Sequence, residues 1–216
     1  MKTAKIIGST GLVGSKLCSL VAADNRFEKI YAVSRKPPEN LTAKVSFVDF
    51  DSGNYNIPAC VDFAFCCLGT TMKKAGSREE FLKVDLKMVA DFARKCKAAG
   101  IERLAVVSSI GANAKSSNFY LQTKGRMEEE LKNLEFKRLV IARPSLLLGD
   151  RNEKRLGEDI GKTINKLLGF LMVGKIRKYR GIEAEKVAKA MIKLVGEGEG
   201  ISITESDELE RIANGM

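Results

Sequence analysis

The sequence contains no histidine and no tryptophan, and only 4 of its 216 residues are proline. Without histidine there is no Ser-His-Asp triad, no Cys-His nucleophile and no zinc or non-haem iron held by imidazole. Any proton transfer must therefore use Tyr, Lys, Cys, Asp or Glu, or a group that a cofactor brings.

Long apolar runs and a disulfide framework are also missing. No stretch approaches the length of a membrane span, and Lys2 and Lys5 lead into a strand-like segment without the apolar core of a secretory signal. The five cysteines are odd in number and have no metal-ligand spacing, which indicates reduced thiols and no metal site. Cys66 and Cys67 lie in the apolar run 61–68, so we interpret them as core side chains. These features predict a cytoplasmic protein with no membrane partner.

The formal net charge of +10 suggests an anionic partner, either a nucleotide or a nucleic acid. The basic residues are spread along the chain. Their densest cluster, between Lys175 and Arg180, lacks interleaved aromatic residues, and no helix-turn-helix or zinc-finger spacing is present. We interpret the charge as a solvated basic surface and predict no nucleic-acid partner. The alternative, a nucleic-acid-binding protein, predicts an affinity that falls steeply with salt.

Strand-like and helix-like segments alternate along the chain. This alternation predicts an α/β fold, a doubly wound parallel sheet formed by one domain that spans 1–216. We expect strands at 4–8, 29–34, 45–48, 62–68, 103–107 and 138–142, and helices at about 12–23, 78–99 and 119–131. The roughly 65 residues after Gly149 are predicted to form a small helical cap over the cofactor cleft. Its helices are expected at about 158–171, 184–195 and 207–213, with a flexible joint at 196–200.

Three glycines follow the first expected strand and lead into the first helix. A strand, a glycine turn and a helix N-terminus bring backbone N–H groups and the positive end of a helix dipole together, as the pyrophosphate of a dinucleotide requires. Gly8 would make the tight turn, Gly11 would let phosphate approach, and Gly14 would let the helix pack closely on the sheet. The residues of this turn that are expected to bind the dinucleotide are Gly8, Ser9, Thr10, Gly11, Leu12 and Val13.

The end of the second strand predicts which dinucleotide binds. A protein that uses NAD usually has an acidic residue there, on the ribose 2′-hydroxyl, but this chain has Ser34, Arg35 and Lys36. Arg35 can make a forked, charge-assisted contact with a 2′-phosphate, and Ser34 can add a hydroxyl. This favours NADP(H). The alternative is that Arg35 is a solvated loop residue.

Tyr120 and Lys124 are four residues apart and share one face of an expected helix, while Ser108 and Ser109 end the fifth strand. A phenol is a poor acid at neutral pH, but a neighbouring ammonium lowers a phenol's pKa. In a carbonyl reduction Tyr120 would give its proton to the carbonyl oxygen and Ser109 or Ser108 would hold that oxygen. Lys124 would orient the nicotinamide ribose. The alternative is an exposed helical pair without a catalytic role.

Together these residues resemble the atypical short-chain dehydrogenases/reductases, and in particular their Tat-interacting-protein branch. Five blocks carry the resemblance: 8–14, 67–71, 108–112, 116–125 and 143–151. It implies Asp49 and Phe50 beside the adenine, Leu68, Gly69 and Thr70 along the diphosphate and ribose, and Pro144 and Ser145 near the nicotinamide carboxamide. Phe50 and Leu68 could equally be core residues, and Asp49 could cap a turn. Asp85 stands where larger members of the superfamily carry a helix asparagine, which leaves the proton-relay route open.

We therefore expect an NADP(H)-dependent oxidoreductase that acts on a small carbonyl or alcohol, as a monomer or homodimer. Two alternatives remain: a redox-sensing regulator that binds NADP(H) without turnover, and a sugar-nucleotide epimerase-like enzyme. The short C-terminal segment argues against a bulky nucleotide-sugar, and Tyr120 and Lys124 argue against a sensor. Nothing in the sequence names the substrate.

Overall fold

The computed structural model describes residues 1–38, 42–50, 61–149 and 179–215. Its helical elements are α1 (Leu12–Ala23), α2 (Met72–Ala75), α3 (Arg78–Leu82), the π-helical segment η1 (Lys83–Met88), α4 (Val89–Ala98), α5 (Phe119–Lys132), α7 (Ala184–Gly196) and α8 (Ser206–Ala213). The main sheet contains β1 (Lys2–Ile7), β2 (Phe27–Ser34), β3 (Val45–Asp49), β4 (Phe63–Cys66), β5 (Arg103–Val107), β6 (Arg138–Arg143) and β9 (Gly200–Glu205). Two short strands, β7 (Leu147–Leu148) and β8 (Ile182–Glu183), pair with each other.

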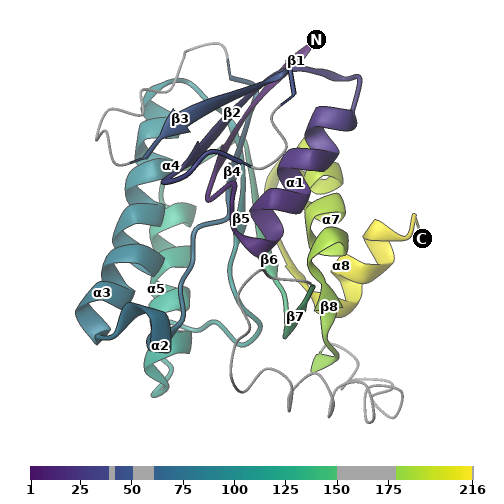
Figure 1. The fold of residues 1–216 in the computed structure, drawn as a ribbon. Coiled ribbons are helices and arrows are strands. Elements are labelled where there is room, and N and C mark those ends of the chain that lie inside the picture. The colour runs from purple at the N-terminus through teal and green to yellow at the C-terminus, as the bar shows by residue number, and fades with distance from the viewer. Residues whose placement is uncertain (39–41, 51–60, 150–178, 216) are drawn as a thin grey trace.

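The seven strands of the main sheet are parallel and follow the order β3-β2-β1-β4-β5-β6-β9 (Figure 1). The chain moves outward from β1 to β3 and then returns to place β4 on the other side of β1. This reversal is the point at which doubly wound sheets bind their ligands, outside the carboxyl ends of the strands. The predicted α/β class and the doubly wound parallel sheet are confirmed.

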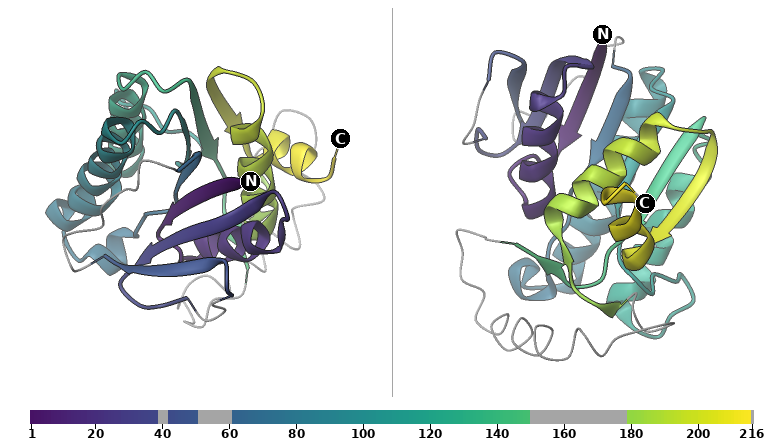
Figure 2. Two further views of the ribbon diagram at one scale, coloured as in Figure 1. Left: turned by 90° about the horizontal axis from the view of Figure 1, so that it is seen from above. Right: turned by 90° about the vertical axis from the view of Figure 1, so that its right-hand side faces the viewer.

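Helices cover both faces of the sheet (Figure 2). One face packs against α1 and α7 around Ile6, Leu17 and Val187, and the other packs against α4 and α5 around Ile7 and Phe92. The strands are apolar along nearly their whole length because both of their faces are buried, as in parallel sheets generally. In the parts of the chain that the structure describes, no helix has the length and apolar character needed to cross a membrane.

Most predicted elements lie where the sequence placed them, and α1 and β5 have the predicted bounds. The helix expected at 78–99 is helical throughout, but η1 interrupts it with a wider turn. Cys66 is buried at the end of β4 and Cys67 is half-buried directly after it, so the interpretation of both as core side chains holds. The helix expected at 158–171 and most of the basic cluster at 175–180 lie outside the described residues.

The C-terminal residues that the structure describes belong largely to the sheet and its helical layer. The joint expected at 196–200 leads directly into β9, a strand that the sequence analysis missed, and α7 packs against α1. Gly200 to Glu205 alternate apolar and polar residues, but here Ile201 and Ile203 are exposed while Thr204 is buried. Of the predicted cap helices, the one at 184–195 therefore belongs to the core, and the small helix α8 follows β9.

Candidate functional site

The glycine turn lies at the carboxyl end of β1, beside the start of the segment that follows β4. Gly8 has a positive φ of 77°, and a Cβ on it would come within 2.8 Å of the Cys67 carbonyl. A Cβ on Gly14 would come within 2.1 Å of the Gly8 oxygen. The predicted tight turn at Gly8 and the predicted close packing of the helix at Gly14 are both present.

The residues of this turn fit an anionic group. The first N–H groups of a helix have no partner within the helix and carry the positive end of its dipole. At α1 the N-cap is Gly11, which supplies no side-chain cap, and no acidic residue lies in the first turn. The N-terminus of this 12-residue helix is therefore open to a phosphate at the reversal point between β1 and β4.

The end of β2 places Ser34 and Arg35 in different environments. The Ser34 hydroxyl is buried, accepts a hydrogen bond from the Ser9 hydroxyl (3.0 Å) and donates one to the Lys36 carbonyl (2.6 Å). It therefore joins the glycine turn to the loop after β2. Arg35 is exposed at the same strand end. The structure thus leaves the guanidinium accessible and gives the serine hydroxyl protein partners.

Two further groups of predicted residues lie on the same edge of the sheet. Asp49 ends β3 beside Ser34, and the Phe50 N–H donates to the Ser34 carbonyl at 3.0 Å. Leu68, Gly69 and Thr70 follow β4 on the other side of the glycine turn. The strand ends therefore bring together the predicted adenine side and the predicted diphosphate side of the site.

Lys124 is buried and forms an ion pair with Asp85, with 2.8 Å between Lys124 Nζ and Asp85 Oδ1. The other carboxylate oxygen of Asp85 accepts a hydrogen bond from the Thr70 N–H at 2.8 Å. Burial alone would lower the pKa of Lys124, but the negative charge of Asp85, with Tyr120 also contributing, outweighs it and the pKa is raised. Lys124 is therefore an ammonium across the physiological pH range.

Tyr120 is half-buried one helical turn before Lys124, and its ring packs on Phe81 with the ring centroids 5.6 Å apart. Phe81 belongs to α3, which continues directly into η1, the segment that carries Asp85. Residues of the helical stretch 78–88 therefore contact both Tyr120 and Lys124 of α5.

The two serines after β5 differ sharply. The buried Ser108 hydroxyl donates to Glu128, whose carboxylate also accepts a hydrogen bond from Arg143 Nε at 2.9 Å. Ser109 is half-buried, and among the described residues its hydroxyl makes one long contact, of 3.4 Å, with the Ile110 carbonyl. Ser108 therefore belongs to a structural network, whereas the Ser109 hydroxyl is available to a ligand.

Gly125 fixes the loop after β5 against α5. A Cβ on Gly125 would come within 2.1 Å of the Ala114 nitrogen, and the Asn113 N–H donates to the Leu121 carbonyl at 3.1 Å. The backbone of the loop therefore rests on the helix that carries Tyr120. No role was predicted from the sequence for Gly125, Glu128 or Arg143. Their only signal was their presence in or near the blocks that carry the family resemblance.

The predicted nicotinamide side is tied to the C-terminal part of the chain. The Ser145 N–H donates to the Ser206 hydroxyl at 2.7 Å, and the Ser145 hydroxyl donates to the Arg180 carbonyl. The Pro144 carbonyl accepts from the Ile110 N–H at 3.0 Å. These bonds connect the end of β6 with the loop after β5 and with the start of α8.

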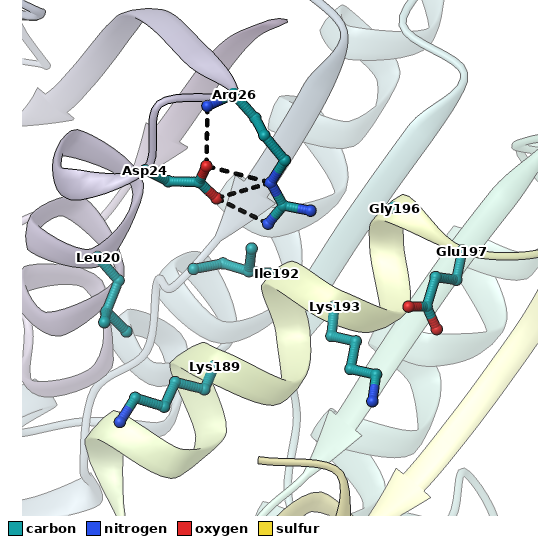
Figure 3. Close-up of a pocket in the computed structure, with 8 residues that line it drawn as sticks. All are labelled: Leu20, Asp24, Arg26, Lys189, Ile192, Lys193, Gly196 and Glu197. Atoms are coloured by element: carbon teal, nitrogen blue, oxygen red, sulfur yellow. Dashed lines mark hydrogen bonds and ion pairs between the residues drawn. The ribbon is translucent and has the colours of Figure 1, made fainter. Parts of the chain in front are cut away.

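A surface hollow of about 440 Å³ lies away from these residues, between the C-terminal ends of α1 and α7 (Figure 3). Its charged residues include Arg26, which forms an ion pair with Asp24, with 2.7 Å between Arg26 Nη2 and Asp24 Oδ2. Because α1 separates this hollow from the glycine turn, it is not part of the candidate site. It also lies at helix C-termini, whose dipoles disfavour anions.

The family model described as "NAD dependent epimerase/dehydratase family" matches residues 4–205. The chain belongs to this family. "Protein FMP52, mitochondrial" of Debaryomyces hansenii is 34% identical over 99% of this chain and 99% of its own length. "Protein HTATIP2" of Rattus norvegicus is 35% identical over 92% of this chain and 84% of its own length. The resemblance to the atypical short-chain dehydrogenases/reductases is confirmed, and a nicotinamide dinucleotide is the cofactor class of the family.

Solved structures support the same fold. A structure of MoeE5 in complex with UDP-glucose and NAD superimposes with a TM-score of 0.70 at 16% identity, over 99% of this chain and 81% of that one. The structure of the human epimerase family protein SDR39U1 with NADPH superimposes with a TM-score of 0.65 at 17% identity, over 94% of this chain and 74% of that one. At these identities the likeness shows the fold alone.

The prediction of a cytoplasmic location is wrong. The FMP52 relatives of Debaryomyces hansenii and Candida albicans, which match 99% and 98% of this chain, are named as mitochondrial proteins. The prediction rested on the absence of secretory features around Lys2 and Lys5. Such features direct a chain to the secretory route and carry no information about import into mitochondria.

Proposed function

We propose that this protein is an NADP(H)-dependent oxidoreductase that interconverts a small carbonyl compound and its alcohol. The observation that carries this proposal is the buried Lys124 ammonium, which lies one helical turn from the half-buried Tyr120 and beside the segment that follows β4. A buried cation next to a phenol favours the phenolate, and so makes the phenol a usable acid and base.

A bound nicotinamide would supply or accept the hydride. In the direction of reduction, Tyr120 gives its phenolic proton to the carbonyl oxygen, and Ser109 donates a hydrogen bond to that oxygen. Lys124 would hold the ribose hydroxyls of the cofactor, and it keeps a positive charge beside Tyr120. We assign this role to Ser109 rather than Ser108 because Glu128 engages the Ser108 hydroxyl.

The cofactor preference depends on Arg35. Its exposed guanidinium at the end of β2 suits a 2′-phosphate, since Arg can contact phosphate with two parallel hydrogen bonds. The Ser34 hydroxyl has its own partners, so we propose that Ser34 shapes the loop while Arg35 contacts the phosphate. We further propose that the glycine turn at 8–13 holds the diphosphate, with Leu68, Gly69 and Thr70 on its other side.

A second candidate is a sugar-nucleotide epimerase-like activity. Two observations favour it: the family model that the chain matches, and the UDP-glucose in the MoeE5 structure with a similar fold. Its substrate would be a nucleotide-sugar rather than a small carbonyl. From the names of the FMP52 relatives we also propose a mitochondrial location, which a tagged chain and cell fractionation would test.

Thermal shifts with NADPH and NADH test the cofactor, because a ligand that binds only the folded state raises its stability. We expect NADPH to stabilise the wild type more strongly than NADH, and Arg35→Ala to lose at least tenfold in NADPH affinity. Arg94→Ala is the matched control, since Arg94 is an exposed arginine on α4. An unchanged preference for NADPH in Arg35→Ala would contradict the role of Arg35.

Oxidation of NADPH in the presence of aldehydes, ketones and quinones tests the reaction, with UDP-glucose as the arm for the second candidate. We expect Tyr120→Phe to lower kcat at least a hundredfold, because the proton donor is removed. Tyr31→Phe, a half-buried tyrosine on β2, is the control. Conversion of UDP-glucose without net NADPH oxidation would favour the second candidate. NADPH binding without turnover of any compound would favour a sensor.

A further inference from the structure

Asp85 is fully buried, and each of its carboxylate oxygens meets a different part of the candidate site. One oxygen lies 2.8 Å from Lys124 Nζ on α5, and the other accepts the Thr70 N–H after β4 at 2.8 Å. A Cβ on Gly69 would lie only 3.5 Å from Asp85 Oδ1 and 3.8 Å from Lys124 Nζ, so the chain after β4 runs directly over the ion pair. One carboxylate therefore connects three segments that are distant in sequence.

The backbone around Asp85 is also unusual. Asp85 lies in η1, a π-helical segment between two α-helical ones. Such wide turns are rare, cost helical hydrogen-bond geometry and occur frequently at functional sites. Here η1 packs against α5, with the carboxylate of Asp85 at Lys124.

The surroundings make Asp85 the counter-charge of Lys124. The titratable groups that face Lys124 in the described structure are Asp85, Tyr120 and Cys66. Burial, the largest effect on the Cys66 thiol, raises its pKa to about 12, so this group is neutral at physiological pH. A buried ammonium without an anion is costly, and the carboxylate of Asp85 offsets that cost.

We propose that Asp85 is a positioning residue of the catalytic site, a role that rests on the function proposed above for Tyr120 and Lys124. Its carboxylate keeps Lys124 protonated, fixes the direction of the ammonium and joins it to the segment at 68–70. It also offsets the positive charge that lies beside Tyr120. An asparagine at this position would supply the hydrogen bond but not the charge.

Thermal unfolding between pH 7 and pH 10 tests the charge pairing without any turnover. In Asp85→Asn, Lys124 stays buried without its anion, so we expect a melting temperature lower by roughly 10 °C at pH 7. Without the anion, the folded-state pKa of Lys124 falls below its unfolded value, so the deficit narrows as pH rises toward 10. Asp91→Asn is the matched control, because Asp91 pairs with Lys95 on the exposed face of α4. The double variant Asp85→Asn/Lys124→Met is expected to recover most of the lost stability.

The pH profile of NADPH oxidation tests the positioning role. In Asp85→Asn, Lys124 lacks its anion and therefore loses its proton more readily. The loss of this proton moves the alkaline limb of the reduction profile toward lower pH, by about one unit. We also expect Asp91→Asn to keep the wild-type profile.

The outcomes separate this role from the proposed function. If the melting temperature of Asp85→Asn is lower than that of the wild type by the same amount at every pH, Asp85 does not act as the counter-charge of Lys124. If the wild type is active and Asp85→Asn keeps its pH profile, the residue is structural and the positioning role is overturned. If the wild type turns over no carbonyl compound, the proposed function fails. In that case the affinity for NADPH tests whether Asp85 positions the segment at 68–70. A loss of affinity of at least tenfold in Asp85→Asn, with no change in Asp91→Asn, supports this positioning. An unchanged affinity in Asp85→Asn overturns it.

Discussion

Lys5 is a residue of the strand β1 and lies outside the candidate site. None of its surface is exposed to solvent. Burial lowers its pKa from 10.5 to about 8, while Cys96 and Lys95 of α4 act on it with opposite signs. Because the folded-state pKa is below the unfolded value, the folded state loses this proton first. The contribution of Lys5 to stability is therefore least favourable below pH 8 and improves as pH rises toward 10.5.

We expect Lys5→Met to stabilise the protein at pH 7 by up to about 3 kcal/mol, the equivalent of the lowered pKa. This gain is expected to disappear by about pH 10.5. Urea unfolding of the wild type and the variant at pH 7 and pH 10 measures it. Lys87→Met, at an exposed position of η1, corrects for the titration of other groups. A gain that is the same at both pH values would show that the Lys5 charge is not its cause.

Individual site residues could be predicted where a local pattern carries the information. The glycine turn is local, and Gly8 and Gly14 have the predicted steric roles. The choice between Ser108 and Ser109 could not be made, because it depends on Glu128, which is 20 residues away along the chain. The ion pair of Lys124 with Asp85 likewise joins two helical segments. The sequence indicated only that Asp85 stands where larger members of the superfamily carry an asparagine.

At the scale of elements, the loop after β5 and helix α5 form one unit, in which the Asn113 N–H donates to the Leu121 carbonyl. Their contact depends on the absence of a side chain at Gly125. Gly125→Ala would push the loop off α5 or distort the helix, so we expect a loss of stability of about 3 kcal/mol and a strong loss of activity. Chemical unfolding and NADPH oxidation measure the two effects.

Gly196→Ala is the control for this variant, because Gly196 ends α7 and a Cβ there would meet nothing within 4 Å. We expect it to be neutral or slightly stabilising, since alanine favours a helix more than glycine does. If Gly125→Ala is as stable as Gly196→Ala, the loop does not depend on this close approach.

The elements themselves could be predicted where apolar residues mark the buried face. This holds for β1, β2, β5 and α1, whose apolar side chains are inside the protein. It fails for β9, whose isoleucines are exposed and whose Thr204 is buried, so that its apolar residues do not mark the inner face. The turn η1 was also missed, because its residues continue a helical pattern without interruption.

At the scale of the whole molecule, β9 and α8 are part of the folded unit. β9 pairs with β6 along six residues from Arg138 to Arg143, and Leu209 of α8 is fully buried in the cluster around α7. A chain that ends at Glu199 would leave one side of β6 without hydrogen-bond partners and would expose the apolar surface of α7.

We therefore expect the chain that ends at Glu199 to lose cooperative unfolding, and to be expanded or aggregated. Circular dichroism during heating and size-exclusion chromatography measure this. A chain that ends at Asn214, and so retains β9 and α8, is the control and should melt as the full chain does. If the shorter chain also melts cooperatively at the same temperature, residues 200–213 form an appendage, as the cap predicted from the sequence would be. If it does not, the residues that follow α7 complete the sheet on which the candidate site is built.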